Sequence, residues 1–108
     1  MTADATILDR LYTTIASRKG TDPTTSYTAK LFVEGRAKIA RKLGEEAVET
    51  TVAALTEGPE RLAGESADLL YHLLVLWADC GVAPAQVWSA LAAREGTSGI
   101  DEKKSRKS

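Results

Sequence analysis

Apolar residues recur at intervals of three or four along most of the chain. Ile7, Leu8, Leu11 and Ile15 form one such stripe, and the same spacing returns in each later segment. No run of four or more residues alternates cleanly between apolar and polar side chains, as a half-buried strand would. The pattern therefore predicts an all-α fold.

Glycine, proline and capping residues divide this pattern into about five helices. Asp4 is placed to cap the first helix and Ser26 the second, with a loop over residues 19–26 between them. Gly58 and Pro59 suit the end of one long helix and the first turn of the next. The predicted helices span about residues 4–18, 27–35, 36–57, 59–80 and 84–94, within one domain of residues 1–100 that is followed by a polar tail, 101–108.

Acidic residues gather on one side of the first long helix, in the stretch KLGEEAVET. With 100° per residue, Lys42, Glu45, Glu46 and Glu49 fall within an arc of about 100°. Like charges at this spacing cost a helix roughly a few tenths of a kcal/mol per pair, so something must offset their repulsion. Apolar residues occupy most of the remaining circumference, and we therefore expect the acids to face a groove between helices.

The second long helix carries a matching polar set on an otherwise apolar rod. Four of its polar residues lie within about 60° of one another in projection: Glu65, Asp68, His72 and Asp79. Two long helices joined by a tight turn are expected to pack antiparallel. The carboxylates of Glu46 and Glu49 would then face those of the ESAD segment, residues 65–68.

Four converging carboxylates predict a bound cation. They cannot all stay ionised in a groove unless protons or cations offset their repulsion. Oxygen-only ligation favours Mg²⁺, with Mn²⁺ possible, over Zn²⁺. Magnesium held in this way usually takes further ligands from a phosphate, which favours cleavage of a phosphate ester or phosphoanhydride. His72 is expected to form hydrogen bonds that support the ligands rather than to bind the metal.

An alternative interpretation gives these acids no chemistry. A single acid is most often a solvated side chain, here paired with Lys38, Lys42 or Arg61. The chain would then be a catalytically inert helical dimerisation module, and glutamine in place of Glu46 or Glu49 would be neutral or slightly stabilising. The joint occurrence of EExxE and ExxD on two apolar helices favours the metal site.

Composition and charge narrow the possible partners. The chain has 14 Lys and Arg against 15 Asp and Glu, a formal charge of -1, so no nucleic-acid or anionic membrane partner is expected. Its start lacks a basic signal-peptide pattern, and the apolar stretch 69–78 is about half as long as a membrane span. The single cysteine, Cys80, is expected to be a buried structural thiol in a cytoplasmic protein.

The residues around these acids resemble a known family. The EExxE and ExxD motifs are similar to those of the all-α nucleoside triphosphate pyrophosphatase superfamily, which includes MazG-type enzymes and dimeric dUTPases. More specifically, SYTAKLFVEGRAKIARKLGEEAVET (26–50) and ESADLLYHLLVLW (65–77) resemble phosphoribosyl-ATP pyrophosphatase of histidine biosynthesis. The likeness runs from about Leu8 to Arg94.

The resemblance implies a reaction and roles for the acids. The reaction is Mg²⁺-dependent hydrolysis of the α–β phosphoanhydride of a nucleotide, phosphoribosyl-ATP, to phosphoribosyl-AMP and pyrophosphate, the second step of histidine biosynthesis. By motif position, the implied metal ligands are Glu46, Glu49, Glu65 and Asp68. Glu45 is a further ligand or orients the attacking water, so the candidate catalytic residues are Glu45, Glu46 and Glu49. A house-cleaning nucleotide pyrophosphatase of MazG or dUTPase type is the nearest alternative.

Two further expectations concern phosphate contacts and assembly. Lys38 and Lys42 lie one helical turn apart near the acids and are candidates for binding the substrate phosphates, with Lys30 and Arg18 as weaker ones. The resemblance also implies a homodimer whose long helices form a four-helix bundle. A chain of 108 residues has little other material to cover two nearly all-round apolar helices, which supports the dimer independently.

Overall fold

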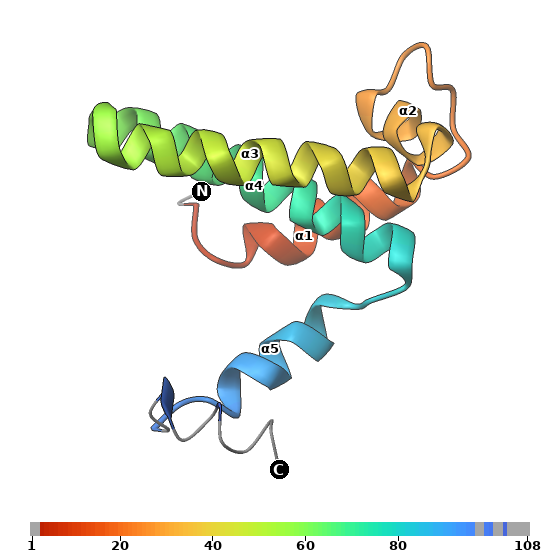
Figure 1. The fold of residues 1–108 in the computed structure, drawn as a ribbon. Coiled ribbons are helices and arrows are strands. Elements are labelled where there is room, and N and C mark those ends of the chain that lie inside the picture. The colour runs from red at the N-terminus through yellow and green to blue at the C-terminus, as the bar shows by residue number, and fades with distance from the viewer. Residues whose placement is uncertain (1–2, 97–98, 101–102, 104–108) are drawn as a thin grey trace.

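The computed structural model describes residues 3–96, 99–100 and 103 (Figure 1). Its helices are α1 (Ile7–Ser17), α2 (Tyr27–Glu34), α3 (Arg36–Thr56), α4 (Pro59–Cys80) and α5 (Pro84–Ala92). Since the described residues contain no strand, the prediction of an all-α fold is confirmed. The predicted polar tail, apart from Lys103, lies outside the described residues.

Short-range signals set most of the helix ends. The Ser26 hydroxyl accepts a hydrogen bond from the Ala29 amide at 3.1 Å and caps α2, as predicted. Gly81 ends α4 in the left-handed region, with φ 74°, where a side chain would be strained. The prediction that Asp4 caps α1 is wrong, because Asp4 and Thr6 close a turn of their own and Thr6 is the residue before the helix.

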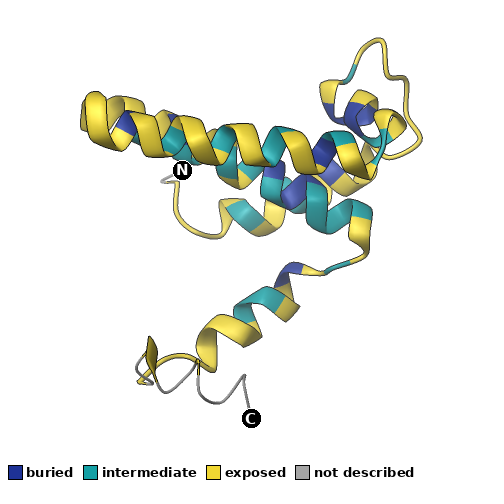
Figure 2. Ribbon diagram, in the orientation of Figure 1, coloured by how far each residue is buried: buried dark blue, intermediate teal, exposed yellow. Residues whose placement is uncertain are grey.

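The two long helices lie side by side as an antiparallel hairpin, with α1 against α4 and α2 against α3 (Figure 1). The core side chains come from all four of these helices: Ile15, Leu31, Ile39, Leu74 and Val75. Figure 2 shows the buried positions gathered at the end of the hairpin near α1 and α2, while the end that carries the α3–α4 turn is mostly exposed. The core therefore anchors one end of the hairpin and leaves the other projecting.

One side of the projecting part of α3 is apolar and exposed. Val48, Val52 and Leu55 are 63%, 48% and 79% exposed, and their i, i+4, i+7 spacing places them in one row. We call these three residues the α3 apolar row. No other described helix covers it, so it is a face that the single chain leaves open.

The chain bends sharply after α4. Trp77 and Trp88 pack edge to face with their ring centroids 5.9 Å apart, and the Trp88 indole donates a hydrogen bond to Asp9 at 3.1 Å, which ties α5 to α4 and α1. Cys80, the last residue of α4, is exposed, so the prediction of a buried thiol is wrong. Apolar residues such as Trp77 and Ala78 lie nearby in sequence, but Cys80 is the last residue of the helix and its side chain does not pack into the core.

Within the described residues, no single helix is both long and apolar enough to cross a membrane; α4 and α5 meet the criterion only as a pair, bent by 112°.

Candidate functional site

Three carboxylates converge where α3 faces α4. One oxygen from each of Glu46, Glu49 and Glu65 lies within 4.8 Å of the other two. The first two side chains share a face of α3 because they are three residues apart, and the antiparallel packing of α4 brings Glu65 opposite them. We call these residues the carboxylate group. It unites acids from both of the motifs that the sequence singles out.

The carboxylate group is short of hydrogen-bond partners. Glu65 is buried and Glu46 partly buried, and the Oε2 atom of each is buried without a partner. Burial raises the pKa of Glu65; Glu49 raises this pKa further, and Arg61 opposes the shift. Buried carboxylate oxygens are normally satisfied. Unpartnered oxygens in so close a group fit a hard divalent cation, which prefers oxygen ligands.

Thr50 connects the two helices through the backbones of two members of the carboxylate group. Its hydroxyl shares its proton between two carbonyl acceptors, that of Glu46 at 2.8 Å and that of Glu65 on the facing helix at 3.1 Å. It therefore holds the backbones of two members of the group together. Sequence reasoning missed Thr50, since a threonine that bonds to the carbonyl four residues earlier is common in helices and carries no distinctive signal.

Asp68, the fourth predicted ligand, lies outside the carboxylate group. Its side chain is exposed one turn along α4 from Glu65, although it is near enough to contribute to the raised pKa of Glu65. Its role as a metal ligand stays a prediction.

His72 is buried and engaged at both ring nitrogens. Nδ1 lies 2.8 Å from the Asp68 carbonyl, which can only accept, so Nδ1 carries the proton. Nε2 lies 3.2 Å from the Tyr27 hydroxyl and accepts from it. The ring also packs edge to face against Tyr27 and Tyr71. Both ring nitrogens of His72 therefore have partners within the protein, and one of these is the backbone at Asp68.

Two of the four cations predicted to bind phosphate form ion pairs with glutamates, and the other two have exposed side chains. Lys42 Nζ lies 3.4 Å from Glu45 Oε2, and this contact raises the pKa of Lys42. Glu45 thus faces Lys42 and is not a member of the carboxylate group. Lys38 pairs with Glu34 at 3.8 Å. The remaining two, Lys30 and Arg18, have exposed side chains.

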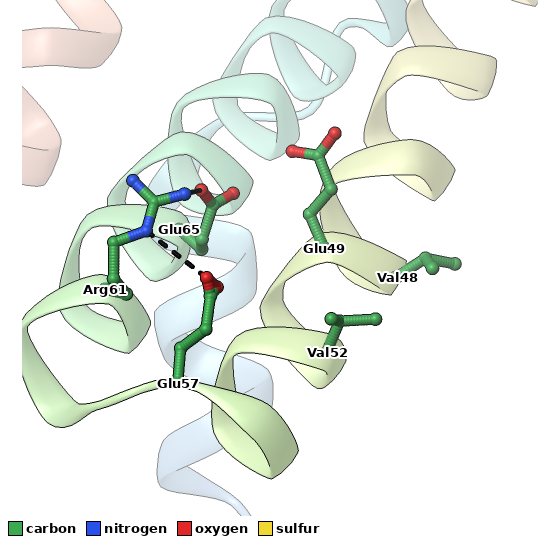
Figure 3. Close-up of a pocket in the computed structure, with 6 residues that line it drawn as sticks. All are labelled: Val48, Glu49, Val52, Glu57, Arg61 and Glu65. Carbon is green, nitrogen blue, oxygen red and sulfur yellow. Dashed lines mark hydrogen bonds and ion pairs between the residues drawn. The ribbon is translucent and has the colours of Figure 1, made fainter.

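A cavity of about 310 Å³ opens beside the carboxylate group. Its lining residues are Val48, Glu49, Val52, Glu57, Arg61 and Glu65 (Figure 3). Figure 3 shows Glu49 reaching from α3 toward α4, where Arg61 lies between Glu57 and Glu65. Val48 and Val52 point away from α4. The cavity thus joins the acids to two residues of the α3 apolar row. Sequence reasoning named Arg61 only as a counter-ion of a solvated acid.

Known proteins are similar in sequence to this chain over nearly its whole length. The family model described as phosphoribosyl-ATP pyrophosphohydrolase matches residues 8–95. A phosphoribosyl-ATP pyrophosphatase of Paramagnetospirillum magneticum is 74% identical over 106 residues, which cover 98% of this chain and 97% of the relative. Proteins of the same name from Azospirillum brasilense and Rhodospirillum rubrum are each 65% identical, covering 96% and 94% of this chain and 94% and 86% of their own length. The chain therefore belongs to the phosphoribosyl-ATP pyrophosphohydrolase family.

Proposed function

We propose that this chain hydrolyses the α–β phosphoanhydride of phosphoribosyl-ATP and releases phosphoribosyl-AMP and pyrophosphate, the second step of histidine biosynthesis. Family membership across residues 8–95 and relatives of that name at 65% to 74% identity support the reaction. The observation that carries the chemistry is the carboxylate group, whose oxygens from two helices lie within 4.8 Å of one another.

The carboxylate group would hold the metal ion. Glu46, Glu49 and Glu65 supply its ligands, and Asp68, on the next turn of α4, completes the set. Mg²⁺ suits this oxygen-only donor set, and Mn²⁺ fits it as well. When bound, such an ion polarises a phosphoryl oxygen and lowers the pKa of a water ligand. Thr50 and His72 hold the backbone of the ligand-bearing turns in place.

The charged side chains beside the carboxylate group would receive the phosphates and the proton. Lys42, now paired with Glu45, binds a substrate phosphate oxygen, and Lys38 binds another one turn away. When Lys42 turns to the phosphate, the Glu45 carboxylate is left free to orient the attacking water and to accept its proton. Lys30 and Arg18 are further candidates for contacts with the outer part of the substrate.

A homodimer in which two hairpins form a four-helix bundle accounts for the α3 apolar row. Isolated exposed apolar residues are normal, but a row on one helix marks an interaction surface. The lone Cys80 fits a reducing compartment, and we propose the cytoplasm as the location.

Added Mg²⁺ should raise the melting temperature of the protein. A ligand that binds only the folded state stabilises it by about 2.7 kcal/mol at a concentration of 100 times its Kd, or about 10 °C for a domain of this size. Differential scanning fluorimetry with and without Mg²⁺ measures the shift, and Glu46→Gln should remove it. An unchanged melting temperature in the wild-type protein would favour the inert dimerisation module.

Phosphoribosyl-ATP should be the preferred substrate of a panel that also contains dUTP, dCTP and ATP. Release of pyrophosphate with Mg²⁺ present is the readout, expressed as kcat/KM for each nucleotide. If the protein hydrolyses the other nucleotides but not phosphoribosyl-ATP, the proposed reaction still holds, and the substrate is that of a house-cleaning enzyme.

Without metal, the protein should lose stability as the pH rises through the pKa of Glu65. The folded state raises this pKa above its ordinary value of 4.5, so it binds the proton more tightly than the unfolded chain does. The resulting stability is fully present below pH 4.5 and is lost as Glu65 ionises in the folded protein. Melting curves in EDTA from pH 4 to 8 should show this loss in the wild type but not in Glu65→Gln. Parallel curves would contradict the shift.

A further inference from the structure

Arg61 lies at the cavity between two carboxylates of unequal exposure. Its Nη2 is 3.0 Å from Glu65 Oε1, and its Nε is 3.6 Å from Glu57 Oε2 (Figure 3). The Arg61 side chain is 66% exposed, that of Glu57 37% and that of Glu65 only 12%. An exposed cation therefore bridges a buried carboxylate and a second acceptor nearer to solvent.

Arg61 is also the cation that offsets charge within the carboxylate group. Among the residues that the structure describes, it alone forms an ion pair with a member of the group, since Lys42 pairs with Glu45 instead. Glu65 offers one oxygen to Arg61, while its other oxygen is buried without a partner. Without Arg61, three carboxylates would face one another with no cation in contact.

The same contact opposes the uptake of a metal ion. A guanidinium on Glu65 Oε1 occupies lone pairs that a metal ligand needs, and its positive charge repels an approaching cation. Glu57 provides a place to which Arg61 can retreat without leaving the cavity, because Nε already faces its carboxylate. The two acids therefore compete for one arginine.

We propose that Arg61 is a positioning residue that holds Glu65 in the metal-free protein and moves fully onto Glu57 when a divalent cation binds. This inference rests on the proposed metal site but not on the identity of the substrate. It assigns opposite effects to Arg61 and to its partner Glu57: Arg61 weakens metal binding, and Glu57 strengthens it. If the ion pairs of Arg61 were only structural, removing Arg61 and removing Glu57 would not change the metal affinity in opposite directions.

Isothermal titration of the full-length protein with Mg²⁺ at low ionic strength tests this assignment. Arg61→Gln should lower the Kd for Mg²⁺ by about two- to fivefold, the effect expected for a partly exposed ion pair, and should lower the melting temperature in EDTA. Glu57→Gln should raise the Kd by a similar factor, because Arg61 then stays on Glu65. Arg61→Lys, which keeps the charge, should lie close to the wild type.

Arg36→Gln is the matched control. It removes the same charge and breaks an ion pair that joins α3 to α4, with Asp79 at 2.8 Å, but Arg36 lies about 20 Å along the α3 axis from Glu49. It should leave the Kd for Mg²⁺ unchanged. Shifts of the same sign in Arg61→Gln and Glu57→Gln, or no shift in either, would overturn the inference while leaving the metal site intact. A wild-type protein that takes up no Mg²⁺ would overturn both.

Discussion

Glutamine in place of Glu49 should lower kcat/KM for phosphoribosyl-ATP by about a thousandfold or more and leave the helices folded. Glu49 is exposed on α3, so the substitution disturbs no core packing, yet its carboxylate belongs to the carboxylate group. Glutamine keeps the shape of the side chain and removes the charge that a hard cation requires. A thousandfold loss equals about 4 kcal/mol of transition-state stabilisation, the scale expected when metal polarisation fails.

Pyrophosphate release under steady-state conditions measures this loss, with Glu60→Gln as the control. Glu60 is an exposed acid in the first turn of α4 and lies outside the carboxylate group, so its variant should stay within about twofold of the wild type. Both variants should show the circular dichroism of the wild type. If Glu49→Gln kept more than about a tenth of the activity at saturating Mg²⁺, Glu49 would not be a ligand.

Aspartate in place of Val52 should separate the proposed dimer into monomers. Val52 is the middle residue of the α3 apolar row, and in a two-fold interface each substitution acts twice. Losing the burial of one valine costs at least about 1.5 kcal/mol, so two copies should raise the dimer Kd by about a hundredfold or more. Sedimentation equilibrium at micromolar concentration should then show a shift toward the 11.6 kDa single chain.

Val33→Asp tests whether any exposed valine has this effect. Val33 is 68% exposed on α2, near the start of α3 and away from the projecting end of the hairpin. The variant should sediment as the wild type does. A wild-type protein that sediments only as an 11.6 kDa species would contradict the dimer, and equal dissociation by both variants would place the interface elsewhere.

The helices could be predicted closely because their ends depend on short-range chemistry. Ser26, Gly58 and Gly81 mark boundaries through backbone geometry that neighbouring residues suffice to define. The meeting of two acidic motifs likewise follows from helical periodicity and a tight turn. The predicted cap of α1 was wrong because the Asp4 carboxylate accepts a hydrogen bond from the Thr6 amide, two residues away, instead of capping the helix.

The details of the site depend on features that a helical projection omits. Projection places Glu65 and Asp68 on similar faces of α4, but only the depth of packing separates the buried carboxylate from the exposed one. Arg61 could turn toward any acid within one helical turn, and its choice depends on the cavity that forms when α3 and α4 pack. The hydrogen bonds at both ring nitrogens of the buried His72 likewise require Tyr27, which is 45 residues away in sequence.

The short link between α3 and α4 has a consequence for how this family can vary. Glu57 and Gly58 alone separate the two helices, and Glu57 also faces Arg61. One inserted residue, if absorbed as added helix, would rotate α4 by about 100° relative to α3 and carry Glu65 away from Glu46 and Glu49. Unlike most surface loops, which tolerate changes in length, this link is a spacer whose residue count is part of the geometry of the carboxylate group.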